Sequence, residues 1–241
     1  CAIMLEPIQG EGGIIPSETG YLKDVQDLCR DKGILFILDE VQAGMGRTGK
    51  FWSFEHTHLI PDIIVAGKGL SNGYAAISAI VGKEKIIDSL KKGEHVFTYT
   101  GHPASCAVAN EVIKLIKNEL PQIKEKGDFF ISELKKIIKA FPQLKIKVRG
   151  KGFMIGVELR NKNNKPIAGI IGKRCTEYGT YFGFIGKENE ILRIQPSYLI
   201  TKKQILFAVN ILKNVLKEYV YNQIPVSTYC SYKKYSLGLG D

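Results

Sequence analysis

The sequence has 241 residues, of which 44% are hydrophobic, and a formal net charge of +10. This length allows one large domain or two small ones with a buried core, and the apolar content is typical of a globular protein. No apolar run is long enough to cross a bilayer and no leader-peptide pattern is present, so we expect no membrane partner. The lysines are spread along helical stretches and form no arginine-rich block, so we interpret the charge as a solvated surface and expect no nucleic-acid partner.

The five cysteines are scattered along the sequence, and none forms a CxxC pair. A zinc site or a redox dithiol is therefore not expected, no metal is assigned, and a reducing, cytoplasmic setting fits best. The sequence begins with Cys1 and continues as a strand-like run over residues 2–5. We interpret the chain as a piece whose N-terminal part is absent.

The first elements predicted along the chain form a β–α–β unit. Residues 2–8 are predicted as a strand, 10–13 as a glycine-rich loop, 17–33 as a helix and 34–39 as a second strand. In the helix, Ser17 is the expected start and Gly33 the expected end. Its apolar stripe is predicted from residues at helical spacing, namely Leu22, Val25, Leu28 and Cys29. The crossover between the two strands should be right-handed.

A long glycine-rich connection over 44–49 leads to two further strands, 63–67 and 77–81. Two helices are expected next, at 103–117 and 122–140, and the second carries many lysines on its outer face. The strands before Asp39 and Lys68 are continuous apolar runs, which is typical of parallel strands covered on both faces.

The second half of the chain is predicted as a smaller α+β domain. Its elements are short strands at 145–149 and 153–159, a helix at 168–178, a strand at 192–194 and a terminal helix. Thr201 and Gln204 form a capping box for that terminal helix, and its buried stripe is predicted to be Ile205, Val209, Leu212 and Leu216.

We therefore divide the chain into residues 1–118, 119–220 and 221–241. The last segment is rich in Tyr, Ser and Lys without a helical period, which predicts a loose tail.

One acid and one amine follow the two buried strands. Asp39 ends the run 34–38 and Lys68 follows the run 63–67, and the ends of parallel strands are where open sheets bind ligands. A carboxylate can keep a pyridine nitrogen protonated, and an amine can capture an aldehyde, so the two together suit pyridoxal phosphate. Taken singly, Asp39 is equally a helix cap or a surface acid, and Lys68 a solvated lysine.

Three further positions carry suitable chemistry. The stretch 95–101, with Thr98, precedes a predicted helix and could bind phosphate, although an ordinary capping loop explains it as well. Arg193 lies between apolar neighbours and could pair with a substrate carboxylate, or it could face water. Glu11, in the glycine-rich loop, could cover or release that arginine, or it could be an exposed loop acid.

Together these residues resemble the class III (ω-type, subgroup II) aminotransferases, which belong to the fold type I pyridoxal-phosphate enzymes. Four ordered motifs carry the resemblance, namely EPIQGEGG (6–13), DEVQAGMGRTG (39–49), PDIIVAGKGL (61–70) and TYTGHP (98–103). Several motifs in order are far more specific than a lone glycine-rich loop. The resemblance covers about residues 1–218 and implies an α/β fold, with part of a three-layer α/β/α large domain followed by a small α+β domain.

The resemblance also implies roles for residues. Lys68 would bind the cofactor covalently and carry the proton, Asp39 would pair with the pyridine nitrogen, and Val41 would pack on one face of the ring. Gln42 would reach the phenolic oxygen. Thr98 would bind the phosphate of the neighbouring subunit's cofactor, which implies a homodimer.

Glu11 and Arg193 would form a gate that lets one pocket accept both an ω-amine and an α-carboxylate, and Glu6 would support the site from behind. Two departures from the family pattern are visible. Ala43 stands where the family usually has Thr, and residues 194–198 replace a common Pro-Pro-Leu stretch near the carboxylate site.

The function expected from the resemblance is amino transfer from an amine such as acetylornithine, ornithine or 4-aminobutyrate to a 2-oxo acid such as 2-oxoglutarate. An amino-acid racemase or epimerase of the same family and a truncated, non-catalytic fragment or interaction domain remain open. An NAD-binding domain is discounted because no complete GxGxxG follows a strand. The front half of the family pattern is absent from these residues, so we expect weak or no catalysis unless it is supplied elsewhere.

Overall fold

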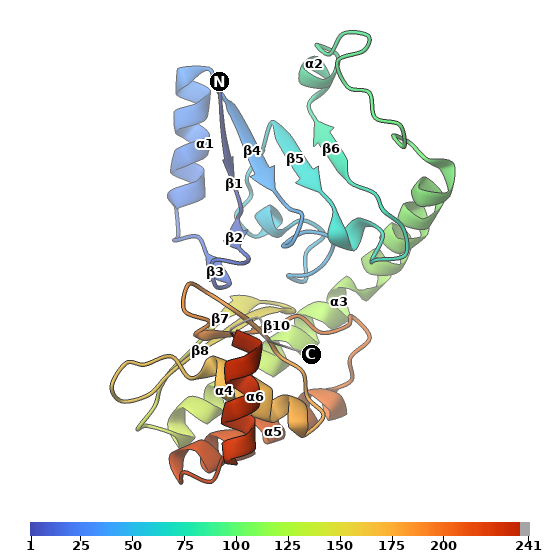
Figure 1. Ribbon diagram of the computed structural model, residues 1–241. Helices are drawn as coiled ribbons and strands as arrows, with labels where there is room; N and C mark the ends of the chain where they lie inside the picture. Colours follow the sequence, from blue (N-terminus) through green and yellow to red (C-terminus); the bar gives the residue numbers. More distant parts are fainter. Residues whose placement is uncertain (237–241) are drawn as a thin grey trace. The chain divides into compact units, whose positions relative to one another are not determined.

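The computed structural model describes residues 1–236. The chain divides into two compact units (Figure 1). Unit 1 comprises Cys1–Gly10 and Pro16–Lys124, and unit 2 comprises Glu11–Ile15 and the chain from Glu125 onward. The division after Lys124 falls within helix α3, a few residues beyond the boundary expected at 119.

A four-stranded sheet forms the centre of unit 1 (Figure 1). Its strands lie in the order β1 (Ala2–Leu5), β4 (Leu35–Asp39), β5 (Ile63–Ala66) and β6 (Ala79–Gly82). The first three are parallel, and β6 is antiparallel to β5. The prediction of neighbouring parallel strands before Asp39 and Lys68 is therefore confirmed.

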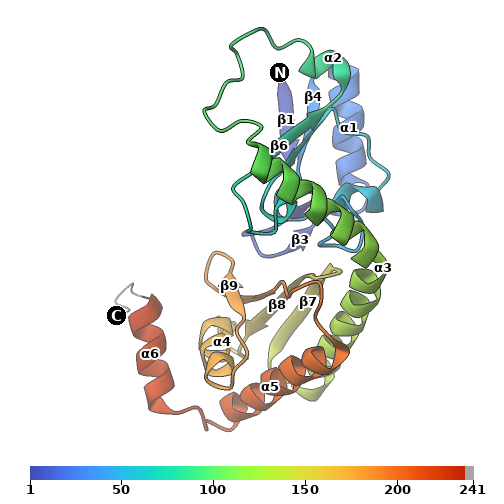
Figure 2. The same ribbon diagram turned by 90° about the vertical axis from the view of Figure 1, so that its right-hand side faces the viewer.

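Helix α1 (Tyr21–Lys32) runs along one face of this sheet (Figure 2). The core between them consists of Leu22, Cys29, Phe36, Leu38 and Leu59. Gly33 ends the helix in the left-handed conformation, with φ 65°, as predicted.

The predicted start of α1 at Ser17 is wrong, because the helix begins at Tyr21 after Gly20. The backbone N–H of Ser17 instead donates to the carbonyl oxygen of Pro7 at 3.2 Å, which keeps Ser17 in the preceding loop.

The opposite face of the sheet carries apolar side chains that remain partly exposed in this chain. The strand register places Met4, Ile37 and Ile63 in one row across this face. Asp39 and Ile80 lie in the next row, on either side of Val65. Met4 is 51% exposed and Ile80 is 54% exposed, so the described residues do not cover this face as α1 covers the other.

Short elements connect the strands of unit 1. They are β2 (Ile8–Gln9), which pairs with β3 (Ile15–Pro16), the 3₁₀ turns η1 (Ser53–His56) and η2 (Lys68–Leu70), and helix α2 (Glu84–Ile87).

Helix α3 is continuous from Pro103 to Ala140, so the prediction of two helices is wrong. Pro121 lies inside it, where proline lacks the N–H of a helical hydrogen bond. The helix continues because its buried stripe is occupied on both sides of the proline, by Ala109, Val112, Ile116, Ile123, Phe130, Leu134 and Ile137. Neither α3 nor another helix within residues 1–236 is long and apolar enough to span a membrane.

Unit 2 is built on an antiparallel sheet. Its strands lie in the order β7 (Lys145–Lys151), β8 (Met154–Arg160), β10 (Ile191–Ile194) and β9 (Gly183–Ile185). Helices α4 (Ala168–Glu177) and α5 (Lys202–Val220), together with the end of α3, bury its inner face.

The predicted start and buried stripe of α5 are confirmed. Thr201 Oγ1 accepts from the backbone N–H of Gln204 at 3.2 Å, and Gln204 Oε1 accepts from the backbone N–H of Thr201 at 2.9 Å. All four predicted core residues are buried, namely Ile205, Val209, Leu212 and Leu216.

The loose tail predicted from residue 221 is wrong over 226–236, which forms helix α6 (Val226–Ser236). Thr228 Oγ1 donates to Glu177 at 2.9 Å. The hydroxyl of Tyr232 lies against Gly169, where an added Cβ would sit only 2.2 Å from it. Thr228 and Tyr232 of this segment therefore contact α4. The end of the predicted tail, 237–241, lies outside the described residues.

Candidate active site

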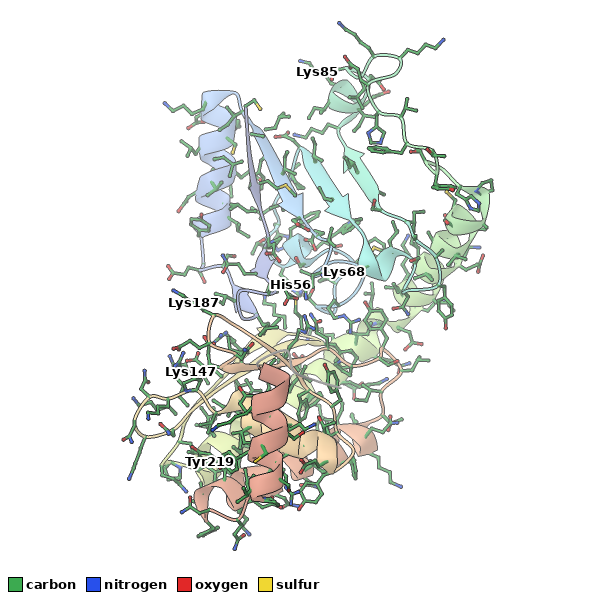
Figure 3. All side chains as sticks on the ribbon, in the orientation of Figure 1. His56, Lys68, Lys85, Lys147, Lys187 and Tyr219 are labelled. Carbon is green, nitrogen blue, oxygen red and sulfur yellow. The ribbon has the colours of Figure 1, made fainter. Side chains whose placement is uncertain are left out.

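The ends of three neighbouring strands in unit 1 carry three of the predicted site residues. Glu6 follows β1, Asp39 ends β4 and Lys68 follows β5, as Figure 3 shows for the lysine. Because these strands are parallel and adjacent, the three residues share one edge of the sheet. Asp39 lies directly opposite Val65, and Val65 comes only three residues before Lys68 in the sequence.

The Asp39 carboxylate is held at one oxygen and free at the other. Its Oδ1 accepts from the backbone N–H of Val41 at 2.9 Å, which is a local turn typical of aspartate. Its Oδ2 accepts no hydrogen bond from residues 1–236. The side chain is half-buried, so a ligand with a ring N–H can reach an oxygen whose orientation is already fixed.

Lys68 has an unusual backbone conformation, with φ 40°. Residues with a Cβ rarely adopt the left-handed region, and such strain is concentrated at functional sites. The backbone N–H of Leu70 donates to the carbonyl oxygen of Gly67 at 2.9 Å and closes the turn around the lysine. The side chain is exposed, and its amine forms no ion pair within the described chain.

Two glycines bring the loops of this edge into contact. A Cβ added to Gly67 would lie 3.4 Å from Val41, so the turn after β4 touches the turn that carries Lys68. A Cβ added to Gly10 would lie only 1.6 Å from Gln42 Oε1, so the Gln42 amide occupies the space that Gly10 leaves open. The N–H of Gly10 also donates to Glu6 at 2.9 Å, which connects Glu6 to the same cluster.

Glu40 is fully buried beside Asp39, and the sequence did not reveal what it binds. Its Oε1 accepts from Ser53 Oγ at 2.7 Å and from the N–H of Phe54 at 2.9 Å, and its Oε2 accepts from the N–H of Ser53 at 3.0 Å. Burial raises the pKa of Glu40, and these hydrogen bonds offset only part of that rise. Glu40 thus connects the turn after β4 to η1.

Thr98 is not brought to Asp39 and Lys68 by any contact within residues 1–236. It lies exposed in a turn just ahead of α3, where the N–H of Thr100 donates to Phe97 at 3.0 Å. A cavity of about 800 Å³ beside this loop is lined by Thr100, Val65 and Ile80, among others, and includes neither Asp39 nor Lys68. The phosphate-binding role of Thr98 stays a prediction.

In unit 2 the structure pairs Glu11 with Arg193, as predicted, although they lie 182 positions apart in the sequence. Arg193 Nη1 lies 2.5 Å from Glu11 Oε1, with the two side chains 32% and 67% exposed respectively. A Cβ on Gly183, in the neighbouring strand, would lie 3.3 Å from Arg193 Nε, so that glycine leaves room for the guanidinium. The pairing is observed, while the gating role stays a prediction.

A hollow of about 380 Å³ in unit 2 is lined by Arg193, Gln195, Thr180, Phe207 and other residues. Gln195 Nε2 is buried and has no hydrogen-bond partner among residues 1–236. Gln195 belongs to the stretch that departs from the family pattern, and that departure was the only signal for it in the sequence.

Comparison with known proteins identifies the family. The family model described as class III aminotransferase matches residues 1–216. The acetylornithine aminotransferase of Methanocaldococcus jannaschii is 41% identical over 219 residues, and the ornithine aminotransferase 2 of Staphylococcus saprophyticus is 37% identical over 220 residues. Each match covers 90% of this chain but only 53% and 52% of the relative.

Solved structures agree with these relatives. The ornithine aminotransferase of Plasmodium yoelii matches with a TM-score of 0.83 and 33% identity, covering 90% of this chain and 57% of that one. The acetylornithine aminotransferase of Elizabethkingia anophelis matches with a TM-score of 0.82 and 33% identity, covering 90% and 54%. The chain thus spans about half the length of the relatives it matches, and it belongs to the class III aminotransferases, a family of pyridoxal-phosphate enzymes of fold type I.

Proposed function

We propose that the protein containing this chain is a pyridoxal-phosphate-dependent aminotransferase that moves an amino group from an amine or ω-amino acid to a 2-oxo acid such as 2-oxoglutarate. The observation that carries the proposal is the placement of two residues at the ends of adjacent parallel strands: Asp39, which has one free carboxylate oxygen, and the strained Lys68. The matched relatives are named acetylornithine and ornithine aminotransferases, which favours a donor of that class.

The residues at the sheet edge fit the cofactor. When bound, pyridoxal phosphate accepts the electrons that remain at a substrate Cα after its proton leaves. Asp39 Oδ2 is the open acceptor for a ring N–H, because Oδ1 is already bonded to Val41. Lys68 Nζ is exposed and is assigned to bind the cofactor, take the Cα proton and return it.

Neighbouring side chains are assigned to position the ring. Val41, which contacts the Gly67 turn, packs on one face of the ring, and Gln42 reaches its phenolic oxygen. Glu6 supports them through its hydrogen bond to Gly10. We assign Thr98, which is exposed in this chain, to the phosphate of a second subunit's cofactor in a homodimer.

Glu11 and Arg193 are assigned to substrate selection. While Glu11 neutralises Arg193, the pair presents no free cation, which suits the uncharged part of an ω-amine donor. When Glu11 moves away, the guanidinium can bind an α-carboxylate with two parallel hydrogen bonds. One pocket could then accept both halves of the reaction.

The test is an amino-transfer assay on the full-length protein. With L-ornithine, N-acetylornithine or 4-aminobutyrate as donor, we expect glutamate to form from 2-oxoglutarate. Lys68→Ala should abolish the reaction, whereas Lys85→Ala, which removes another exposed lysine of unit 1 (Figure 3), should leave it intact. Equal activity in wild type and Lys68→Ala would contradict the assignment of the lysine.

The same assay separates the alternatives. Inversion of a single amino-acid enantiomer without any keto acid would indicate a racemase or epimerase. A full-length protein that transfers no amino group from any of these donors would indicate a non-catalytic role. The names of the matched relatives give neither alternative support.

A further inference from the structure

The segment 11–15, which carries Glu11, belongs to unit 2 and packs against its sheet. Ile14 is completely buried, and it lies over Gly156 in β8. A Cβ added to Gly156 would lie 3.0 Å from Ile14 Cβ and 3.1 Å from the carbonyl oxygen of Gly13. A side chain at this position would force its neighbours to shift by a few tenths of an ångström, so glycine favours this close approach.

The backbone of this segment is strained. Ile14 has φ 53°, in the left-handed region that a β-branched residue adopts only when its surroundings impose it. Such a conformation is energetically unfavourable for a residue with a Cβ. Specific contacts must therefore hold the segment in place.

Arg149 supplies those contacts. Its Nε donates to the carbonyl oxygens of Gly13 at 2.9 Å and of Ile14 at 3.1 Å. Its Nη1 donates to Glu158 Oε2 at 2.8 Å, and the two side chains are only 23% and 18% exposed. The guanidinium thus binds Glu158 on β8 and donates to the two carbonyl groups on either side of the strained Ile14 Cα.

The surroundings of Glu158 favour its ionised form, which is the form that pairs with Arg149. Burial alone would raise the pKa of Glu158, but the hydrogen bond from Arg149 and the nearby Lys147 outweigh it and lower the pKa below its usual value. Glu158 is therefore ionised at neutral pH and orients Arg149. Lys147, labelled in Figure 3, lies on the neighbouring strand β7.

The two arginines lie in one row of the sheet. Arg149 on β7 and Arg193 on β10 are both register partners of Gly156 on β8, so they flank the glycine over which Ile14 lies. The other end of the segment is fixed by the N–H of Gly186, which donates to the carbonyl oxygen of Glu11 at 3.3 Å. With both ends of the segment held, the Glu11 carboxylate lies within ion-pair distance of Arg193.

We propose that Arg149 is a positioning residue. Its hydrogen bonds to the carbonyl groups of Gly13 and Ile14 keep Glu11 in its ion pair with Arg193. Arg149 thereby controls how easily Arg193 leaves that ion pair to bind a carboxylate. The link to carboxylate binding rests on the proposed function. The coupling of Arg149 to the ion pair rests only on the contacts within unit 2.

The test measures the rate at which phenylglyoxal modifies each of these arginines in the full-length protein, resolved by peptide mass spectrometry. Ion pairing with Glu11 should protect Arg193, and Glu11→Gln should raise its rate about two- to fivefold, which corresponds to a partly exposed ion pair. Arg149→Met should raise the Arg193 rate by a similar factor. The double variant should show no further rise over Glu11→Gln alone.

Two controls make the result specific. Lys151→Met removes a positive charge from an exposed position of the same strand and should leave the Arg193 rate unchanged. Arg174, bonded to Glu218 and Glu177 in the same unit, reports unfolding. If the Arg174 rate rises in Arg149→Met, that variant is unfolded and Arg149→Lys takes its place. Lysine keeps the charge but lacks the forked donor, so the Arg193 rate should still rise while the Arg174 rate stays unchanged.

An unchanged Arg193 rate in the folded Arg149 variant, while Glu11→Gln raises it, would overturn the proposal, and so would additive effects in the double variant. The labelling needs neither cofactor nor substrate. A failed amino-transfer assay with the expected labelling pattern would overturn the proposed function alone, and the converse result would overturn only the role of Arg149.

Discussion

Two non-glycine residues of the candidate site adopt left-handed backbone conformations, Lys68 with φ 40° and Ile14 with φ 53°. Both are assigned to function, Lys68 to the cofactor and Ile14 to the segment that carries Glu11. Most other non-glycine residues with positive φ are asparagines in turns, which tolerate this conformation. Strain on a lysine and on a β-branched isoleucine therefore points to imposed geometry at these two positions.

The buried Glu40 should contribute measurably to stability. Glu40→Gln replaces one acceptor oxygen with an amide NH₂ that faces the donors of Ser53 and Phe54. Leaving a buried donor without an acceptor costs about 1–3 kcal/mol, so urea unfolding near neutral pH should show a loss of that size. Glu84→Gln, at an exposed acid of α2, should change little. Equal losses in the two variants would contradict the anchoring role of Glu40.

The pH dependence of this effect has a definite sign. Because the pKa of Glu40 is raised above 4.5 in the folded state, the native protein binds a proton more tightly than the unfolded chain does. Stability from this group is therefore fully present below pH 4.5 and decreases as the pH rises through the raised pKa. The advantage of wild type over Glu40→Gln should be larger in acid than near neutral pH, and the reverse trend in urea unfolding would contradict it.

At the scale of residues, the sequence predicted what depends on neighbours along the chain. Asp39, Lys68 and Gly33 each end an apolar run or a helical period, so their places were predictable. The contacts of Glu40 with Ser53, and of Arg149 with Gly13, join residues 13 and 136 positions apart. No local pattern encodes such contacts, because they arise only when strands and loops pack.

At the scale of elements, errors occurred where tertiary contacts override local signals. Two helices were predicted at 103–117 and 122–140, but burial on both sides of Pro121 keeps α3 continuous. Leu28 was placed on the buried stripe of α1, yet it is 47% exposed because it lies one position away from the face that Cys29 occupies. The composition of α6 has no helical period, and its contacts with α4 hold it.

The capping box of α5 should contribute measurably to the free energy of unfolding. Thr201→Ala removes the side-chain acceptor for the N–H of Gln204 and should lower the free energy of unfolding by about 1 kcal/mol. Thr201→Ser keeps the hydroxyl and should lose much less. Chemical denaturation followed by circular dichroism provides the measurement, and identical stabilities of the two variants would refute the role of the cap.

The docking of α6 on α4 can be tested through a buried thiol. Burial raises the pKa of Cys175 in α4 to about 12, so the thiol should resist alkylation in the folded chain. Ending the chain at Tyr221 removes buried Ile224 and Thr228 and should speed iodoacetamide labelling of Cys175 by about tenfold, through local opening of unit 2. Cys29, buried in unit 1, is the internal control and should not change. An unaltered Cys175 rate would mean that α6 does not stabilise this unit.

At the scale of the whole molecule, the fold class was predictable because four motifs along the chain resemble one family. The chain nevertheless spans about half the length of its relatives. One face of the unit 1 sheet, with Met4 and Ile80, remains partly exposed in it.

The resemblance assigns the phosphate loop and the ring-stacking aromatic to the front half of the family pattern. We therefore expect the 241-residue chain alone to transfer amino groups weakly or not at all. The full-length protein should be active in the same glutamate-forming assay. Full activity of the isolated chain would show that these residues form a complete cofactor site.

We propose that Lys68 and Asp39 hold pyridoxal phosphate at neighbouring strand ends. The most direct test is to incubate the full-length protein with pyridoxal phosphate, reduce it with borohydride and map the labelled peptide by mass spectrometry. We predict a stable pyridoxyl group on Lys68, and weaker labelling of the same lysine in Asp39→Asn. Labelling of a different lysine, or none on Lys68 in a protein that binds the cofactor, would contradict the account.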